Sequence, residues 1–372
     1  MKKILVTSTD MMMMQFLLPH VKFLREQGYD VEVACSEVGN RFLEVQSALG
    51  EEKTYKVRLQ RNPIKPSNLK GLSDLKKIIN NGEYDLVWTN EPVMGVMTRL
   101  ASKKARKKGT KVLYMAHGFH FYKGAPKLNW LIYYPIEKMM ARHTDMLVTV
   151  NQEDYERAKK FKARAIKYVH GIGINTNRLN SLSERTDLRE ELGIDKDAII
   201  LLSVGELNSN KNQETALRAF AKIKDTSFHY VLCGKGEKLE FLKKLAIKLG
   251  VLDRTHFLGY RKDVVDICYQ SDIFIMPSKR EGLPVASLEA MYCGLPLVVS
   301  KIRGLRDEVI DGVSGYTCPP SDVKGFSYGI EKLKNDASLR REMGKNNQEI
   351  VKPFCLENTK TEILGLIKDL TK

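Results

Sequence analysis

The chain has 372 residues, of which 43% are hydrophobic and 28% are charged, so it has an ordinary globular composition and enough length for two domains. No apolar run reaches the roughly 20 residues of a membrane-spanning helix, and we interpret the apolar start of the chain as a core strand and not as a signal peptide. The formal net charge of +16 indicates an anionic partner, such as a phosphorylated substrate or a membrane surface. Nucleic acid is disfavoured, because no zinc-finger, KH or RRM signature accompanies the basic residues.

The six cysteines are scattered along the chain and form no C-x-x-C pair. This usage is typical of reduced thiols, so the sequence predicts a cytoplasmic protein. The histidines and cysteines show no metal-ligand spacing, and the single D-x-D motif, Asp195-Lys196-Asp197, falls in a polar turn. We therefore expect no metal site.

The first half of the chain alternates short apolar runs with stretches of helical periodicity. Strands are predicted at 4–6, 31–34, 86–88, 112–115 and 146–150, and helices at 16–27, 75–81 and 94–107. The first of these helices ends at Gly28, a typical helix stop. This order is the βαβ pattern of a parallel sheet.

The pattern starts again after a stretch of turn formers and polar residues at 170–185. Further strands are predicted at 199–205, 230–234, 273–277 and 297–299. We expect an N-terminal Rossmann-like domain at 1–172, a C-terminal one at 173–350, and a C-terminal helix at 351–372 that packs back on the N-terminal domain. Two doubly wound α/β domains that face each other would enclose a deep cleft, with ligands at the carboxyl ends of the strands.

The most informative segment is 277–291, where a strand ends at Pro277 and a helix begins near Pro284. Glu281 precedes this helix and Glu289 lies within it, about 12 Å away at most along the helix axis. Two carboxylates at this spacing suit the hydroxyl groups at opposite ends of a nucleotide sugar. The helix N-terminus between them offers free amides and a positive dipole end to a diphosphate.

This segment, E-G-L-P-V-A-S-L-E-A-M, resembles the E-x7-E signature of the family 4 glycosyltransferases, which have the GT-B fold. The resemblance covers most of the chain, and its further segments are 203–212, 234–237, 258–264 and the glycines and acidic residues of 304–315. Residues 117–124, H-G-F-H-F-Y-K-G, resemble bacterial capsule and exopolysaccharide enzymes that add an N-acetylhexosamine to a polyprenyl-diphosphate-linked acceptor.

The resemblance implies roles for particular residues. Lys211, in the phosphate-contacting segment with Gly205, would neutralise the diphosphate. Glu289 would bind the ribose, Glu281 the sugar hydroxyls, and His117 would lie near the donor sugar. The amides of Gly282 and Leu283 would help hold the sugar and phosphate, and Arg261 would flank the base. The family places an arginine where this chain has Glu206, and Arg280 is a candidate to supply that missing charge.

The acceptor side is assigned to the N-terminal domain. Candidates are Asp10, His120 and Tyr122, although Asp10 is equally suited to be a helix N-cap. Residues 128–140 are apolar, aromatic and flanked by basic residues. They form either a surface helix that contacts an anionic membrane or a helix docked on the domain core. The resemblance and the charge together predict a peripheral protein at the inner face of the cell membrane.

We therefore predict a metal-independent retaining glycosyltransferase without a cofactor, which uses front-face displacement and takes UDP-N-acetylhexosamine as its donor and a polyprenyl-diphosphate-linked saccharide as its acceptor. Two alternatives remain: a GT-B-fold UDP-N-acetylhexosamine 2-epimerase and a non-catalytic subunit that binds nucleotide sugars. A nicotinamide dehydrogenase is disfavoured, because no G-x-G-x-x-G motif follows the first strand of either domain.

Overall fold

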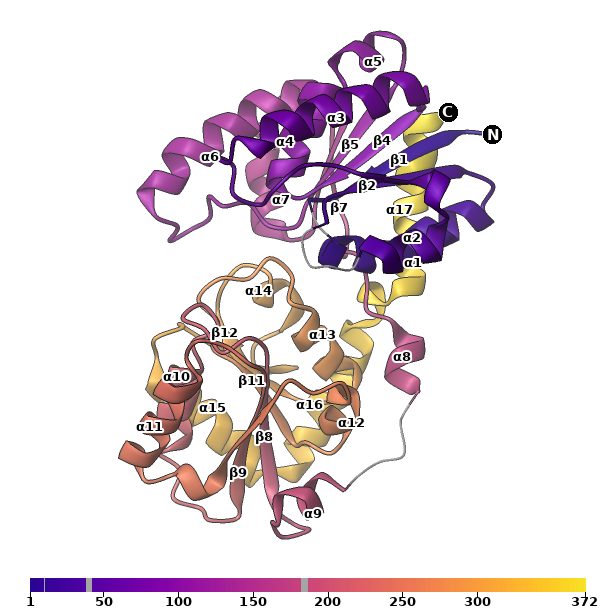
Figure 1. The fold of residues 1–372 in the computed structure, drawn as a ribbon. Helices are drawn as coiled ribbons and strands as arrows, with labels where there is room; N and C mark the ends of the chain where they lie inside the picture. Colours follow the sequence, from indigo (N-terminus) through magenta and orange to yellow (C-terminus); the bar gives the residue numbers. More distant parts are fainter. Residues whose placement is uncertain (10, 38–41, 182–186) are drawn as a thin grey trace. The chain divides into compact units, whose positions relative to one another are not determined.

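The computed structural model describes residues 1–9, 11–37, 42–181 and 187–372. The chain divides into two compact units (Figure 1). The N-terminal unit comprises Met1–Ile172 with Glu357–Lys372, and the C-terminal unit comprises Gly173–Leu356. The last helix is thus part of the unit that contains the start of the chain. No helix in the described ranges combines the length and the hydropathy needed to cross a membrane.

The N-terminal unit is built on a seven-stranded parallel sheet with the order β3-β2-β1-β4-β5-β6-β7. Its strands are β1 (Lys3–Thr7), β2 (Asp30–Cys35), β3 (Thr54–Lys56), β4 (Leu86–Asn90), β5 (Lys111–Ala116), β6 (Met146–Thr149) and β7 (Ala165–Tyr168). Strand β1 lies centrally, with Val6 paired to Val33 on one side and to Trp88 on the other. Because helices cover both faces, the central strands are mainly apolar, and their polar residues, such as Thr7 and Asn90, lie at the strand ends.

Helices pack on both faces of this sheet (Figure 1). They are α1 (Met11–Glu26), α2 (Phe42–Leu49), α3 (Ser67–Gly82), α4 (Pro92–Ala101), α5 (Lys103–Lys107), α6 (Lys127–Met140), α7 (Gln152–Ala158) and α17 (Leu356–Thr371). Leu5 and Val87 pack with α3 and α4 in one core cluster. Trp88, the next residue after Val87, meets His20 of α1 edge-on at 6.0 Å on the opposite face. Successive side chains of β4 therefore serve two separate cores.

The C-terminal unit contains a six-stranded parallel sheet with the order β10-β9-β8-β11-β12-β13. Its strands are β8 (Ile199–Val204), β9 (Phe228–Cys233), β10 (Thr255–Gly259), β11 (Ile273–Met276), β12 (Leu297–Ser300) and β13 (Gly315–Cys318). Leu201 and Tyr230 belong to one core cluster, whereas their neighbours Ile200 and Val231 belong to the other. The period of two along each strand distributes the apolar residues between the two faces.

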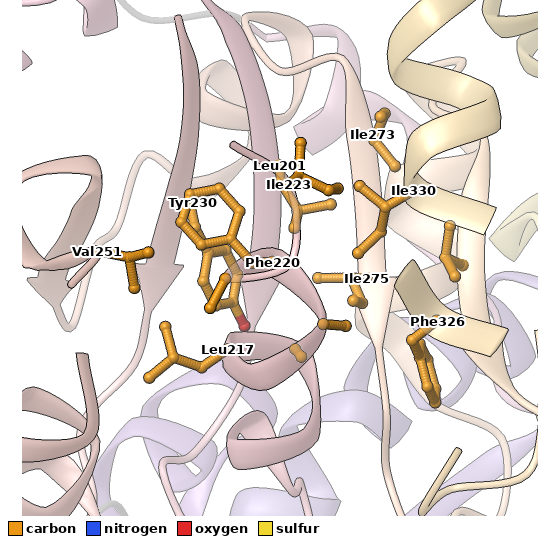
Figure 2. Packing of buried hydrophobic residues seen from close by; sticks show 14 of the residues in the cluster. Leu201, Leu217, Phe220, Ile223, Tyr230, Val251, Ile273, Ile275, Phe326 and Ile330 are labelled. Carbon is orange, nitrogen blue, oxygen red and sulfur yellow. The ribbon is translucent and has the colours of Figure 1, made fainter. Parts of the chain in front are cut away.

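Helices of the C-terminal unit cover these two faces. They are α8 (Thr176–Asn180), α9 (Leu188–Leu192), α10 (Gln213–Phe220), α11 (Leu239–Leu249), α12 (Val264–Tyr269), α13 (Val285–Tyr292), α14 (Leu305–Glu308), α15 (Val323–Asn335) and α16 (Ala337–Ile350). Figure 2 shows one of the two cores, where Phe220 of α10 and Phe326 of α15 pack near Tyr230 and Ile275 of the sheet. Short 3-10 turns occupy Glu51–Lys53, Ala141–His143, Leu252–Arg254 and Lys352–Phe354.

The elements differ from the sequence predictions in several respects. Helix α3 begins at Ser67 and not at 75. Helix α1 begins at Met11 and not at 16, because methionines are good helix formers and extend the first turn. The helix predicted at 94–107 is divided at Ser102, whose hydroxyl donates to the Thr98 carbonyl (2.7 Å) and so competes with regular helical bonding. Strands β3, β7, β10 and β13 were not predicted, because three to five residues give little periodicity.

Candidate functional site

Two glycine turns lie side by side at the carboxyl ends of β8 and β9. The amide of Gly205 donates to the carbonyl of Cys233 (2.9 Å), and the amide of Gly234 donates to the carbonyl of Gly259 (2.7 Å). A Cβ atom at position 234 would stand 1.9 Å from the carbonyl oxygen of Gly205. Only a glycine permits this close approach of the two backbones. Both turns lie at the carboxyl ends of their strands, which is the edge where parallel sheets bind ligands.

Lys211 follows the first of these turns and reaches Glu281. Its Nζ lies 2.8 Å from Glu281 Oε1, and both side chains are mostly buried, with 22% and 12% of their surface exposed. The turn is held by Asn208, whose Oδ1 accepts from the Lys211 amide (2.9 Å). The next residue, Asn212, donates through its side-chain amide to the carbonyl of Pro277 (2.9 Å). The fold therefore brings two predicted site residues, 70 positions apart, into an ion pair.

The Glu281 loop is tied to the Lys211 turn through its backbone. The Lys279 amide donates to the carbonyl of Asn210 (2.8 Å), and the side-chain amide of Asn210 donates to the carbonyl of Arg280 (3.0 Å). On the other side, Arg303 Nε donates to the carbonyl of Glu281 (3.0 Å). These contacts hold the carboxylate from both neighbouring loops.

The start of α13 presents free donors next to this carboxylate. Within the described part of the chain, the amides of Gly282 and Leu283 donate to no acceptor, and no side chain caps the helix. Ser287 stabilises this turn, and its Oγ lies 2.5 Å from Glu308 Oε2. Glu308 is fully buried, and burial raises its pKa well above the usual range. A raised pKa disfavours a negative charge on Glu308 near the helix start, and the free amides there suit an anionic ligand.

Glu289 lies on α13, with 13% of its side chain exposed. Arg178 of α8 donates through Nη2 to Glu289 Oε1. Burial raises the pKa of Glu289, and the Arg178 charge opposes that shift. The arginine thus favours the ionised form of the Glu289 carboxylate.

Arg261 and Arg280 have different surroundings. Arg261 lies between two carboxylates: its Nε is 2.8 Å from Asp263 Oδ1 and its Nη2 is 3.0 Å from Glu191 Oε2. Its guanidinium is therefore held in a fixed plane. The Arg280 and Glu206 side chains are exposed. The geometry does not assign Arg280 to the place that an arginine at position 206 would take, so that role stays a prediction.

His117 lies at the carboxyl end of β5 in the N-terminal unit. Its Nε2 is 3.0 Å from Oδ1 of Asn90, the last residue of β4. Asn90 is fully buried and its Nδ2 donates to the carbonyl of Thr7 (3.2 Å). Burial lowers the pKa of His117 to about 4, so the ring is neutral at physiological pH.

The loop after His117 is anchored to the start of α7. The Phe119 amide donates to Asp154 Oδ2 (2.9 Å), and the Lys123 amide donates to Glu153 Oε1 (2.8 Å). The rings of Phe119 and Phe121 stack with centroids 4.7 Å apart inside an aromatic cluster. The aromatic residues of the H-G-F-H-F-Y-K-G run therefore fix the loop that carries the histidine.

The remaining acceptor candidates are His120, Tyr122 and Asp10. The ring of His120 lies 4.7 Å from that of Tyr133 of α6 in a tilted arrangement, and Tyr122 lies partly buried further along the same loop. The structure brings neither of them into a hydrogen bond with His117 among the described contacts. Asp10 lies outside the described residues.

Helix α6 packs on the domain core, which is one of the two alternatives that the sequence left open, and it also has exposed apolar side chains. Its inner face is docked, since the buried Glu137 accepts from the buried Arg99 (2.8 Å) and from Tyr114 (3.1 Å). Its outer face is apolar and exposed at Leu128 (62%), Leu131 (75%), Ile132 (43%) and Met139 (53%). The helix is therefore fixed on the core and still presents an apolar stripe.

Sequence reasoning missed several residues that position the site. Asn90, Arg178, Arg303 and Asp154 carry no motif, and each contacts a residue remote in the sequence. Asn90 alone left a signal, as a polar residue directly after a buried strand. The carboxyl end of a parallel strand is a place where such residues meet ligands or ligand-binding side chains.

Two Rossmann-like units, the second with a lysine–carboxylate pair and free amides at the carboxyl edge of its sheet, define a GT-B glycosyltransferase. A family model described as "Glycosyl transferase 4-like" matches residues 4–151, and another, "Glycosyl transferases group 1", matches residues 184–350. The chain belongs to the family 4 glycosyltransferases, and its fold is GT-B.

Similar proteins cover almost the whole chain. It is 37% identical over 372 residues to EpsD of Bacillus subtilis (strain 168), which is named as a glycosyltransferase. This match covers 98% of this chain and 96% of EpsD. It is 28% identical over 363 residues to the Escherichia coli UDP-Gal:alpha-D-GlcNAc-diphosphoundecaprenol alpha-1,3-galactosyltransferase, with 95% and 92% covered. The solved structure of Anabaena HepE with UDP matches with a TM-score of 0.81 at 20% identity over 99% of this chain and 100% of HepE.

Proposed function

We propose that this glycosyltransferase moves a hexose-type sugar from a UDP-sugar onto a polyprenyl-diphosphate-linked saccharide, with retention of anomeric configuration. The observation that carries the proposal is the position of Lys211 against Glu281, next to the free amides of Gly282 and Leu283. A cation and two amide donors suit the diphosphate, and a carboxylate beside them suits the hydroxyls of the attached sugar.

In this proposal, Lys211 and the amides stabilise the charge that develops on the departing diphosphate. Glu289 accepts the ribose hydroxyls and Arg261 flanks the base. His117 bonds a sugar hydroxyl through its neutral ring. The departing diphosphate oxygen helps to deprotonate the incoming hydroxyl, so that catalysis consists of positioning and charge neutralisation.

The donor base and acceptor class are supported by relatives. The Escherichia coli enzyme is named for a UDP-sugar and a diphosphoundecaprenol-linked acceptor. It is a galactosyltransferase by name, whereas the H-G-F-H-F-Y-K-G run led to an N-acetylhexosamine. We keep UDP-N-acetylhexosamine as the predicted donor and treat UDP-galactose as the competing candidate.

We also propose that the enzyme works at a membrane surface through α6. The exposed stripe of Leu128, Leu131 and Ile132 follows helical spacing, and the exposed Lys127 and Lys138 belong to the same helix. An apolar stripe with lysines around it suits a bilayer that contains anionic lipids. Such a surface is where a polyprenyl-linked acceptor resides.

The experiment is a ligand panel followed by a transfer assay. Thermal unfolding is measured with UDP, GDP and ADP and with UDP-linked glucose, galactose and their N-acetylamino forms, because a specific ligand raises apparent stability. We expect UDP and one UDP-sugar to raise Tm, and Glu289→Gln to abolish the increase. A rise in Tm with GDP or ADP alone would overturn the assignment of a UDP-sugar as the donor.

Transfer is then measured with the stabilising donor and a short-chain polyprenyl-diphosphate saccharide, and NMR of the anomeric proton reports retention. Conversion of the donor to its 2-epimer without acceptor would identify an epimerase. Tight donor binding without turnover for any acceptor would indicate a non-catalytic subunit.

A further inference from the structure

The contacts of Asn90 determine which nitrogen of His117 carries the proton. Asn90 lies at the end of β4, next to β1 in the centre of the sheet, and none of its surface is exposed. A buried amide has two distinct ends, a donor and an acceptor, and each must find its complement. Its neighbours therefore decide its orientation.

One neighbour of Asn90 has a fixed role. The carbonyl oxygen of Thr7 can only accept, and it lies 3.2 Å from the Nδ2 atom of Asn90. The opposite orientation would bring two oxygens together. The Asn90 amide nitrogen therefore faces Thr7, and its oxygen faces His117.

The Asn90 oxygen accepts and does not donate. Since it lies 3.0 Å from His117 Nε2, this nitrogen must carry the hydrogen. The ring is neutral, because burial lowers the pKa of His117 to about 4. A neutral imidazole has a single N–H, so Nδ1 keeps its lone pair. Among the described residues, no contact occupies Nδ1.

We propose that Asn90 is a positioning residue that holds His117 in the Nε2–H tautomer, so that Nδ1 accepts a hydrogen bond from a substrate hydroxyl. This inference rests on the proposed function for the substrate, but the tautomer itself depends only on the N-terminal unit. With the other tautomer the ring would present a donor at Nδ1, and a hydroxyl would have to bind in the reverse sense.

The first test reads the tautomer directly. Two-bond and three-bond 1H–15N correlations distinguish Nδ1 from Nε2 protonation in the 15N-labelled wild-type enzyme, and the His117 signals are assigned by their loss in His117→Gln. We expect the Nε2–H pattern at pH 7. An Nδ1–H pattern in the wild-type enzyme overturns the proposal without the need for any Asn90 variant.

The second test removes the acceptor. Asn90→Leu keeps the size of the side chain and leaves Nε2 without a partner, so His117 should show a mixture of tautomers. If the leucine variant does not fold, as judged by its thermal transition, Asn90→Ser takes its place. A pure Nε2–H pattern in a folded Asn90 variant contradicts the inference.

A double-mutant cycle then connects the tautomer to turnover. Asn90→Leu should lower kcat/KM by about the same factor as His117→Gln, and the double variant should lose no more than His117→Gln alone. Fully additive losses would show that Asn90 acts by another route. A wild-type enzyme with the expected tautomer but without transferase activity would refute the proposed function and leave the role of Asn90 intact.

Discussion

The ammonium of Lys211 lies 2.8 Å from Oε1 of Glu281, in a setting where both side chains are largely removed from solvent. In the proposed function, the diphosphate of the nucleotide sugar contacts Lys211, and the sugar hydroxyls contact Glu281, with which the lysine is already paired. The lysine is therefore held in place before the donor arrives, so little side-chain entropy remains to be lost on binding.

Replacement of Lys211 by methionine should lower kcat by roughly 100-fold or more, because the charge that stabilises the leaving group is removed. Lys279→Met is the matched control, since it removes the same charge from an exposed position two residues before Glu281. Steady-state kinetics with saturating donor measure both. Equal kcat values for the two variants would exclude a role of Lys211 in leaving-group stabilisation.

Removal of Arg178 should make nucleotide binding more sensitive to acid. Burial raises the pKa of Glu289 and the arginine lowers it, so in Arg178→Met that pKa rises further. The ionised carboxylate is then lost at a higher pH, and affinity for UDP should begin to fall at a higher pH than in the wild-type enzyme. Calorimetric titrations between pH 5 and 8 measure this, with Arg218→Met on α10 as the control. Parallel pH profiles would show that the two residues are not coupled.

Substitution of Gly234 should disturb the proposed nucleotide site through the neighbouring turn at Gly205. Its added Cβ would stand 1.9 Å from the Gly205 carbonyl, a backbone atom that has to move. We expect Gly234→Ala to weaken UDP binding at least about tenfold and to destabilise the enzyme by about 1–3 kcal/mol. Gly250→Ala also replaces a glycine of positive φ, but nothing lies within 4 Å of its added Cβ. That control should keep its UDP affinity, and similar affinities for both variants would contradict the prediction.

The N-terminal unit should lose stability in mild acid because of His20. Only 1% of this residue is exposed, its Nε2 lies 2.8 Å from the Ile172 carbonyl, and burial lowers its pKa to about 4. Between pH 6.5 and 4 the unfolded chain binds the proton and the folded chain does not, so stability falls as the pH falls through this window. The contribution to the free energy of unfolding should be about 2 kcal/mol smaller at pH 5 than at pH 7.

Urea unfolding followed by tryptophan fluorescence tests this, because both tryptophans, Trp88 and Trp130, lie in the N-terminal unit. His20→Gln keeps a donor for the carbonyl and should reduce the pH dependence. His170→Gln removes a more exposed histidine and should leave most of the pH dependence of stability unchanged. An unchanged slope in His20→Gln would assign the acid sensitivity to other groups.

The α6 stripe should bind vesicles. Leu131→Ser with Ile132→Ser removes two exposed apolar side chains, so co-sedimentation with vesicles that contain anionic phospholipid should fall several-fold. Leu69→Ser with Leu43→Ser is the control, since both leucines are exposed on other helices. Binding lost equally in both pairs, or in neither, would argue against α6 as the membrane contact.

The fold could be predicted from the sequence alone, and so could the residue types of the candidate site. The alternation of short apolar runs with helical stretches predicts two parallel sheets, because strands buried on both faces are mainly apolar. The spacing of Glu281 and Glu289 around a helix start predicts a nucleotide-sugar site, since that chemistry depends on local geometry within one strand-loop-helix segment. Both of these are properties of neighbouring residues, so the sequence carries them directly.

Tertiary structure alone decided which distant residues meet. Lys211 and Glu281 come together because β8 and β11 are adjacent in the sheet. Asn90 reaches His117 because β4 and β5 are paired, and Arg178 reaches Glu289 across 111 positions. Such pairs depend on strand order, and no periodicity or motif within a segment encodes it. The sequence therefore determined the chemistry of each loop, whereas the fold determined the orientation, charge state and partners of the side chains that those loops carry.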